Sequence, residues 1–301
     1  MNSSRQSVRL QRSFAHRIAN SDSNALFNLL THEAMFDKLE QLLPEHRERL
    51  YTPTQTLAMF MTQVLHSDRS CQQIVNEMAA VRASAQMKPL STRTGGYCRA
   101  RQRMPLTLPR ELTRHCANEM IDRLPAGWLW KGRAVKLVDG TTLSMPDTQA
   151  NQQRFAQSQS QQPGVGFPIC RLVGLMCLGC GALIDIAYGP YQGKQTGEQS
   201  LLRPLLDNLQ DDDVLLGDGF YGTYFLLCEL QRRGVDGVFE QMGARKKTTD
   251  FRRGKSLGRK DHLVSLKGPK NRTGCQNRRI EKHPRVLLCE SCALMEKQQR
   301  H

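Results

Sequence analysis

Two aspartates occupy matching places in this sequence, each after a short apolar run and directly before a glycine. Asp139 ends the apolar run of "AVKLVDGTT", and Asp218 ends that of "LLGDGFYGTYF". A carboxylate at the end of a buried strand is costly unless it is paired or binds a cation. We therefore expect each acid to lie at the C-terminal end of a strand, and the two carboxylates to meet if those strands are neighbours.

Two convergent carboxylates suit hard divalent cations such as Mg²⁺ or Mn²⁺, because these ions prefer oxygen ligands. A pair of such ions can clamp the attacking and leaving oxygens of a phosphoryl displacement. The pattern thus indicates metal binding by Asp139 and Asp218 and phosphoryl-transfer chemistry. The alternative is that each Asp only caps the turn or helix that follows it, which is a common role for this residue.

The region from residue 134 onward has the pattern of strands that later alternate with helices. One strand ends at Asp139, a hairpin covers 170–189, and another strand ends at Asp218. A helix with Thr196 as its N-cap lies between the hairpin and the second acid, and Gly234 ends the helix after it. This order predicts an α/β fold in which a mixed sheet carries flanking helices.

Residues 1–125 are expected to form an all-α N-terminal domain, because their apolar residues recur at helical spacing. The stretch "TPTQTLAMFMTQVLH" has the signature of a helix start. Thr52 is the expected N-cap, Pro53 the first helical residue and Gln55 the capping-box partner.

A second stretch of this region, "STRTGGYCRARQRMP", is interrupted by Gly95 and Gly96 and restarts with Arg99, Arg101 and Arg103. Short helices with an arginine-rich turn can dock on DNA in the manner of a helix-turn-helix. A plain helical bundle with solvated arginines fits the same pattern, and both interpretations stay open.

Positive charge is concentrated near the C-terminus. The 301 residues carry a net charge of +15, and 241–301 hold 17 Lys and Arg against 5 Asp and Glu, a net of +12. The remaining 240 residues therefore carry 15 − 12 = +3. So dense a basic segment favours contacts with nucleic acid phosphates. The candidates for these contacts are Arg252, Arg253, Lys255, Arg259 and Lys260.

The sequence gives no sign of a membrane partner. Its longest apolar run, 172–184, is too short to span a bilayer, and "MNSSRQSVRL" leads into no apolar core of a signal peptide. We therefore expect a cytoplasmic protein that contacts DNA.

Several blocks carry a resemblance to a known family. "KLVDGTTLSMPDTQANQ", "GPYQGKQTGEQSLLRPLL", "DVLLGDGFYGTYFLLCELQRRGVDGVFEQ" and "TTDFRRGKSLGRKDHLVSLKGPK" resemble, in order, the DDE transposases of the insertion-sequence family numbered four. The resemblance covers roughly 25–270. It implies an RNase H-like catalytic core with a strand-rich insertion, and an Asp-Asp-Glu set that binds Mg²⁺ to cut and join DNA at transposon ends.

On this resemblance Asp139 is the first acid, Asp218 the second, and "DFRRGKSLGRKDHLVSL" the start of the insertion. Gly219 stands where many members have Arg. The family's third acid lies in a Tyr-x2-Arg-x3-Glu-x6-Lys signature beyond the insertion, but the last tyrosine here is Tyr224. Glu240 is the nearest candidate for a third acid, and it occupies the wrong place in the family order.

We therefore expect an incomplete site and a tail translated in a shifted reading frame. The alternative is a genuine short protein whose tail folds. The expected domains are 1–125, helical; 126–243, an incomplete catalytic core; 244–270, the start of the basic insertion; and 271–301, an aberrant, disordered tail. The expected partners are double-stranded DNA at transposon ends and target, and a second copy in a homodimer. The alternative function is a non-catalytic DNA-binding remnant, which inhibits intact transposase by competing for ends or by forming mixed dimers.

Overall fold

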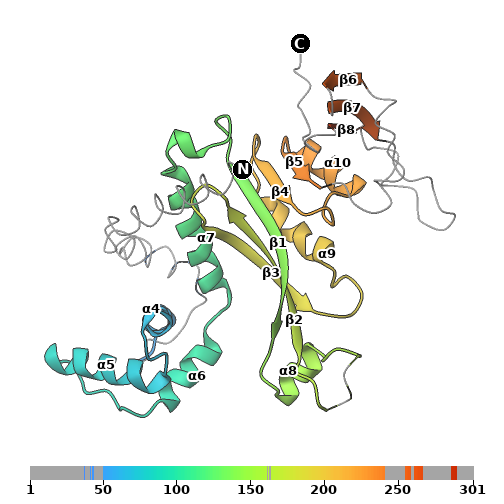
Figure 1. Cartoon of the computed structure of the whole chain (residues 1–301). Coiled ribbons are helices and arrows are strands. Elements are labelled where there is room, and N and C mark those ends of the chain that lie inside the picture. The colour runs from blue at the N-terminus through green and yellow to red at the C-terminus, as the bar shows by residue number, and fades with distance from the viewer. Residues whose placement is uncertain are drawn as a thin grey trace, which may run out of the picture. The chain divides into compact units, whose positions relative to one another are not determined.

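The computed structural model describes positions 37, 41 and 43, then 50–240 except 161 and 163, and three strands at 255–258, 261–266 and 286–289. The chain divides into two compact units, Met1–Leu112 and Thr113–His301. The division falls inside helix α7 (Thr107–Asp122), whereas the sequence analysis placed it at residue 125. Figure 1 shows the elements of both units.

The first unit contains α4 (Pro53–Leu65), α5 (Cys71–Ser84) and α6 (Gly95–Arg103) before the start of α7. The predicted start of α4 is confirmed, because the Thr52 hydroxyl accepts from the backbone N–H of Gln55 at 3.2 Å and Pro53 is the first helical residue. The Gln55 side chain, predicted to complete a capping box, instead donates to the Met78 sulfur at 3.9 Å. The helices pack around a small core of Met59, Ile74, Val75 and Tyr97.

The two glycines of this unit begin helix α6, so the predicted interruption at Gly95 and Gly96 is wrong. Close packing explains the second glycine. A Cβ atom at position 96 would lie 2.9 Å from a ring carbon of Tyr51, which is closer than side chains normally approach. The backbone of Gly96 in the first turn of α6 thus packs directly against the Tyr51 ring.

The second unit is built on a five-stranded sheet of order β3-β2-β1-β4-β5 (Figure 1). Its strands are β1 (Val135–Ser144), β2 (Ile169–Cys177), β3 (Leu183–Pro190), β4 (Val214–Gly217) and β5 (Asp236–Phe239). The first three strands are antiparallel neighbours, whereas β4 pairs parallel to both β1 and β5. The predicted mixed α/β sheet is therefore confirmed.

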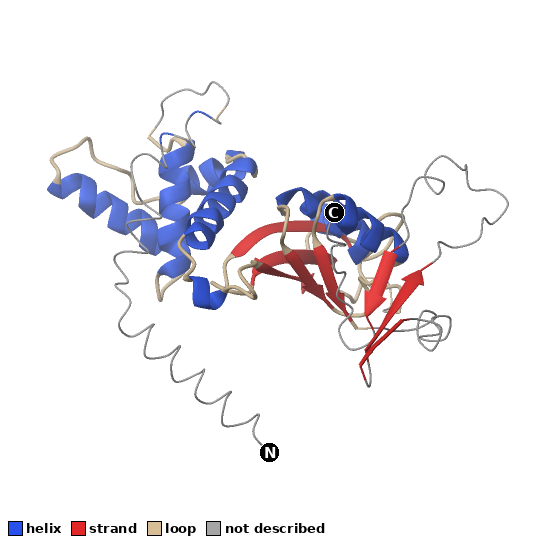
Figure 2. Cartoon of the chain, turned by 90° about the horizontal axis from the view of Figure 1, so that it is seen from above, coloured by secondary structure: helices blue, strands red, loops and turns tan. Residues whose placement is uncertain are grey.

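Helices cover one face of this sheet. Besides α7, the helical elements of this unit are η1 (Ala126–Trp128), α8 (Gln149–Arg154), α9 (Glu198–Leu202), η2 (Arg203–Asn208) and α10 (Tyr224–Arg232). Val138 and Leu175 point to one side of the sheet and form a core with Ala117 of α7, Leu205 of η2 and Leu227 of α10. Figure 2 shows the helices in blue and the strands in red.

The opposite face of the sheet is open only in part, because Cys170 on this face is buried and Arg154 of α8 lies over the Tyr188 ring. Strand alternation places Leu143, Met176, Ile186 and Tyr188 on the side away from the core. These four apolar side chains are 37–51% exposed. Asp139 lies on the same face, because it alternates with the buried Val138 along β1.

The region between β3 and β4 differs from the prediction. Gly197 is the N-cap of α9, and the predicted cap residue, Thr196, instead donates its hydroxyl proton to the carbonyl of Gly193 at 3.0 Å. The α-helix is short because Pro204 lacks the N–H that a longer helix needs, and the chain continues as the 3₁₀ helix η2. The predicted end of α10 is confirmed, since Gly234 follows it with a φ of +66°.

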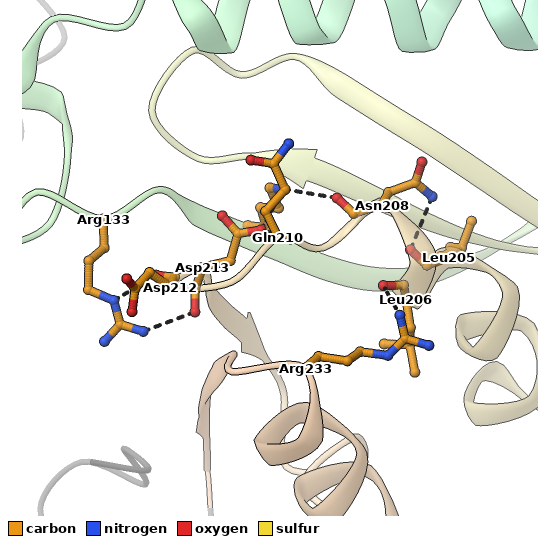
Figure 3. A network of polar contacts seen from close by, with 9 residues as sticks. Arg133, Leu205, Leu206, Asn208, Gln210, Asp212, Asp213 and Arg233 are labelled. Carbon is orange, nitrogen blue, oxygen red and sulfur yellow. Dashed lines mark hydrogen bonds and ion pairs between the residues drawn. The ribbon is translucent and has the colours of Figure 1, made fainter. Parts of the chain in front are cut away.

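Buried charges join the amino ends of the parallel strands. Lys136 and Asp213 form an ion pair at 2.6 Å and are only 4% and 5% exposed, and Lys136 also donates to the Asn208 carbonyl at 2.9 Å. Arg133 pairs with Asp236 at 2.5 Å. It also donates to the Asp213 carbonyl at 3.1 Å (Figure 3). These contacts connect β1, β4, β5 and η2 at one end of the sheet.

A second, antiparallel sheet contains β6 (Lys255–Gly258), β7 (Asp261–Leu266) and β8 (Val286–Cys289), with β7 in the middle. Val264 of β7 is buried in the core of the second unit. Strands β6 and β7 lie in the region expected to begin a strand-rich insertion. Strand β8 lies within 271–301, where the sequence analysis expected disorder. In the part of the chain that the structure describes, no helix is long and apolar enough to cross a membrane.

We predict that Lys136→Met lowers the free energy of unfolding by about 3–5 kcal/mol, because it leaves the Asp213 carboxylate buried without its partner. Arg123→Met is the matched control, since Arg123 pairs with Glu119 on an exposed helix surface, and it should cost less than about 1 kcal/mol. Urea unfolding followed by circular dichroism measures both. Equal losses in the two variants would contradict the role given to the buried pair.

Candidate functional site

The register of β1 and β4 places the two aspartates at the same level. The parallel pairing runs from Val135↔Val214 to Leu137↔Leu216, an offset of 216 − 137 = 79 residues. Asp139 and Asp218 have the same offset, 218 − 139 = 79, so each lies two residues beyond the last pair on its own strand. Residues at matching positions of parallel strands point to the same side of a sheet. The register therefore brings the backbones of the two acids to the same level beyond these adjacent strands.

One expectation about this geometry is wrong. Asp139 does not end its strand, because β1 continues to Ser144. The reason is the antiparallel neighbour, β2, which pairs with β1 from Lys136 through Asp139↔Gly174 to Ser144↔Ile169. The parallel pairing with β4 stops at Leu137, before Asp139. From Asp139 onward, β2 is the neighbour with which β1 pairs among the described strands.

Both carboxylates are exposed and bond to nearby backbone. The Asp139 Oδ1 atom accepts from the N–H of Gly140 at 2.8 Å. The Asp218 Oδ1 atom accepts from the N–H of Phe220 at 2.9 Å, and the Asp218 carbonyl accepts from the N–H of Tyr221 at 3.3 Å. Asp218 thus caps the turn after β4, the role that the alternative interpretation assigned to it, and uses one carboxylate oxygen to do so.

Among the described residues, no Lys or Arg forms an ion pair with Asp139 or Asp218. Two neighbouring carboxylates without a cationic partner repel each other, and a bound cation relieves that repulsion. Their oxygen atoms are the donors that Mg²⁺ and Mn²⁺ prefer. Within the same described part of the chain, no group of three or more His, Cys, Asp or Glu side chains is arranged to hold a metal ion.

Glu240 follows the third parallel strand at the corresponding position. The pairing of β4 with β5 ends at Gly217↔Phe239, so Asp218 and Glu240 come next on their respective chains. The Glu240 side chain is exposed. The acid that the sequence analysis set aside therefore follows the strand beside Asp218, one strand further from Asp139.

Glu198 is an acid of this region that the sequence analysis missed. Its Oε2 atom accepts a hydrogen bond from the hydroxyl of Tyr221 at 3.2 Å. Burial raises the pKa of Tyr221, and the negative charges of Glu198, Asp139 and Asp218 raise it further. The useful signal was the glycine after Asp139, which leaves room for another chain segment.

The three arginines of α6 have different environments. Arg99 and Arg103 are exposed. Arg101 is partly buried, donates to the Gln63 side chain at 3.3 Å and lies over the Phe60 ring at 4.8 Å from its centroid. Arg101 is therefore engaged within the helical unit, while Arg99 and Arg103 present their side chains to solvent.

The basic segment is described only in part. Lys255 is the first residue of β6 and is exposed. Arg252, Arg253, Arg259 and Lys260 lie outside the described residues. Gly219, which directly follows Asp218, is buried.

Comparison with known proteins gives one weak similarity. The chain is 26% identical over 108 residues to the protein named "Putative transposase InsZ" of Escherichia coli (strain K12). The match covers 36% of this chain and 35% of that protein. The chain thus spans about a third of the curated relative that it matches. No protein-family model matches the sequence. This partial similarity supports a relationship to transposases.

Proposed function

We propose that the chain is a DDE transposase of an insertion sequence, of the family numbered four, with Asp139 and Asp218 as two of its three acids. The observation that carries the proposal is the shared 79-residue offset, which brings the two carboxylates to one level of adjacent parallel strands. The mixed sheet supports an RNase H-like core, and the similarity to a protein named as a transposase supports the reaction class.

The donor atoms of this site fit a divalent cation. Asp139 and Asp218 would hold Mg²⁺ or Mn²⁺, since both carboxylates are exposed and neither is paired with a basic side chain within the described residues. When bound, the metal would stabilise the charge that develops on phosphate oxygens during phosphoryl transfer. The exposed Asp139 side chain would be accessible to a DNA backbone at this point.

The 301-residue chain on its own is proposed to be catalytically incomplete. It has no Tyr beyond Tyr224, so the family signature that carries the third acid is missing from these residues. Glu240 and Glu198 are the other acids near the pair, and neither forms a three-ligand group with it among the described side chains. Two carboxylates can hold a cation but leave the positions of the attacking and leaving oxygens poorly defined.

The second candidate function is DNA binding without catalysis. Its support is the net charge of +12 over 241–301, with the exposed Lys255 at the start of β6, and the exposed Arg99 and Arg103 on α6. Such a protein would occupy the double-stranded ends of the transposon at the nucleoid. It would inhibit intact transposase by competing for those ends or by forming mixed dimers.

We predict that the chain does not cut or join matched transposon-end DNA in the presence of Mg²⁺. A strand-cleavage and strand-transfer assay on the purified protein measures this, with Asp139→Ala as the control variant. Turnover in the unmodified chain that Asp139→Ala abolishes would show that Glu240 or another acid completes the site.

The basic segment is predicted to bind DNA in a salt-dependent, sequence-independent manner. Each neutralised phosphate should contribute about 0.9 log units of affinity per log unit of salt, because counterions are released. We therefore expect a flatter salt dependence when alanine replaces Arg252, Arg253, Lys255, Arg259 and Lys260. Fluorescence anisotropy with labelled duplexes at several salt concentrations measures the slope, and an unchanged slope would leave the segment as a solvated surface.

The arginines of α6 are predicted to separate into two kinds. The double variant Arg99→Ala, Arg103→Ala should weaken DNA binding. Its free energy of unfolding should stay within about 0.5 kcal/mol of that of the unmodified chain, since both side chains are exposed. Arg101→Ala should instead cost about 1–2 kcal/mol of stability, through its lost hydrogen bond and ring contact. Loss of DNA affinity in Arg101→Ala alone would reverse this assignment.

A further inference from the structure

The carboxylate of Glu198 rests directly on the backbone that follows the first aspartate. A Cβ atom built on Gly140 would lie 2.4 Å from the Glu198 carboxyl carbon and 2.8 Å from its Oε1 atom. Real side chains do not approach so closely, so only glycine fits at position 140 while Glu198 is in place. Asp139 and Gly140 are adjacent in sequence, so the Glu198 carboxyl group lies against the backbone next to Asp139.

The same short helix also holds the segment that follows the second aspartate. Tyr221 is fully buried, and its hydroxyl donates to Glu198 at 3.2 Å. Gln199, the next residue of α9, donates its side-chain amide to the carbonyl of Phe220 at 2.9 Å. Phe220 and Tyr221 belong to the turn that Asp218 caps. The first residues of α9 thus bond to Phe220 and Tyr221, which follow Asp218. The Glu198 side chain also lies against Gly140, which follows Asp139.

Glu198 lies on the other side of β1 from the Asp139 carboxylate. Gly140 alternates with Asp139 along the strand, and the direction of its missing side chain, toward Glu198, is that of the buried Val138. The Tyr221 ring approaches Gly217 from the same covered side, at 3.3 Å from an ideal Cβ there. Glu198 therefore reaches the two aspartates through the backbone and Tyr221, and not as a third carboxylate beside them.

From these contacts we propose that Glu198 and Tyr221 are positioning residues, which fix the separation of Asp139 and Asp218 so that both can hold the same divalent cation. The inference rests on the proposed function of the two aspartates as metal ligands. Outer groups that orient metal ligands commonly contribute ten-fold or more to metal affinity, although they do not touch the ion. The Tyr221 hydroxyl is a donor at physiological pH, as in any tyrosine, and burial and the surrounding carboxylates raise its pKa further.

The test measures Mn²⁺ affinity of the full chain by electron paramagnetic resonance of free Mn²⁺. Tyr221→Phe and Glu198→Ala should each weaken binding by about ten-fold, because each removes the contact between them. Glu198→Gln keeps an acceptor oxygen and should recover most of the affinity. Tyr188→Phe is the matched control, since its ring is 43% exposed on the open face, and it should bind as the unmodified chain does.

The variants also separate positioning from metal ligation. If Glu198→Gln binds Mn²⁺ as weakly as Glu198→Ala, Glu198 acts as a ligand and the positioning role is overturned. Unchanged affinity in Tyr221→Phe overturns it as well. All measurements are made below the thermal transition of each variant, so that a general loss of folding does not produce the effect.

Hydrogen exchange gives a second readout that needs no metal. In Tyr221→Phe, amide hydrogen exchange should accelerate in peptides that cover 137–142 of β1, although Tyr221 lies in the turn after β4. In Glu198→Ala it should accelerate in peptides that cover 218–222 as well. If the unmodified chain binds no Mn²⁺, the metal proposal fails, and these exchange rates still decide whether the pair holds the two segments. Unchanged exchange in both peptides would refute the positioning pair.

Discussion

The ion pair between Lys136 and Asp213 is the constraint on which the rest of the second unit depends. Both side chains are almost completely buried at the amino ends of β1 and β4. Lys136 also bonds to the Asn208 carbonyl at the end of η2, and Asp213 to the N–H of Gln210 in the loop that follows. A slip of one residue between the strands would turn Lys136 to the opposite face and leave Asp213 unpaired. The pair therefore selects the register, and the register sets the level of the two aspartates at the other end.

The buried charges act mainly by raising the free energy of alternative strand registers, in which they would be unpaired. A buried ion pair adds little net stability over apolar residues, but a single buried charge without its partner is expensive. Arg133 reinforces this selection, since it bonds to Asp236 of β5 and to the carbonyl of Asp213. Three parallel strands are thus aligned from one end, and the opposite end carries Asp139, Asp218 and Glu240 in corresponding positions.

Much of the architecture followed from local patterns in the sequence. Apolar runs and turns predicted the mixed sheet, and the caps at Thr52 and Gly234 were predicted from residue chemistry that acts within one turn. The errors arose where distant segments decide the outcome. Strand β1 extends past Asp139 because β2 pairs with it, and helix α6 begins on glycines because the Tyr51 ring occupies the space beside Gly96. The roles of Glu198 and Arg101 likewise depend on partners more than twenty residues away.

The contact between Gly140 and Glu198 also limits the order in which the two positions can change in evolution. A side chain at position 140 would collide with the Glu198 carboxyl group, so alanine there is acceptable only after residue 198 has become shorter or has moved. Shortening residue 198 first deprives the buried Tyr221 hydroxyl of its acceptor. The three positions should therefore change together among related chains.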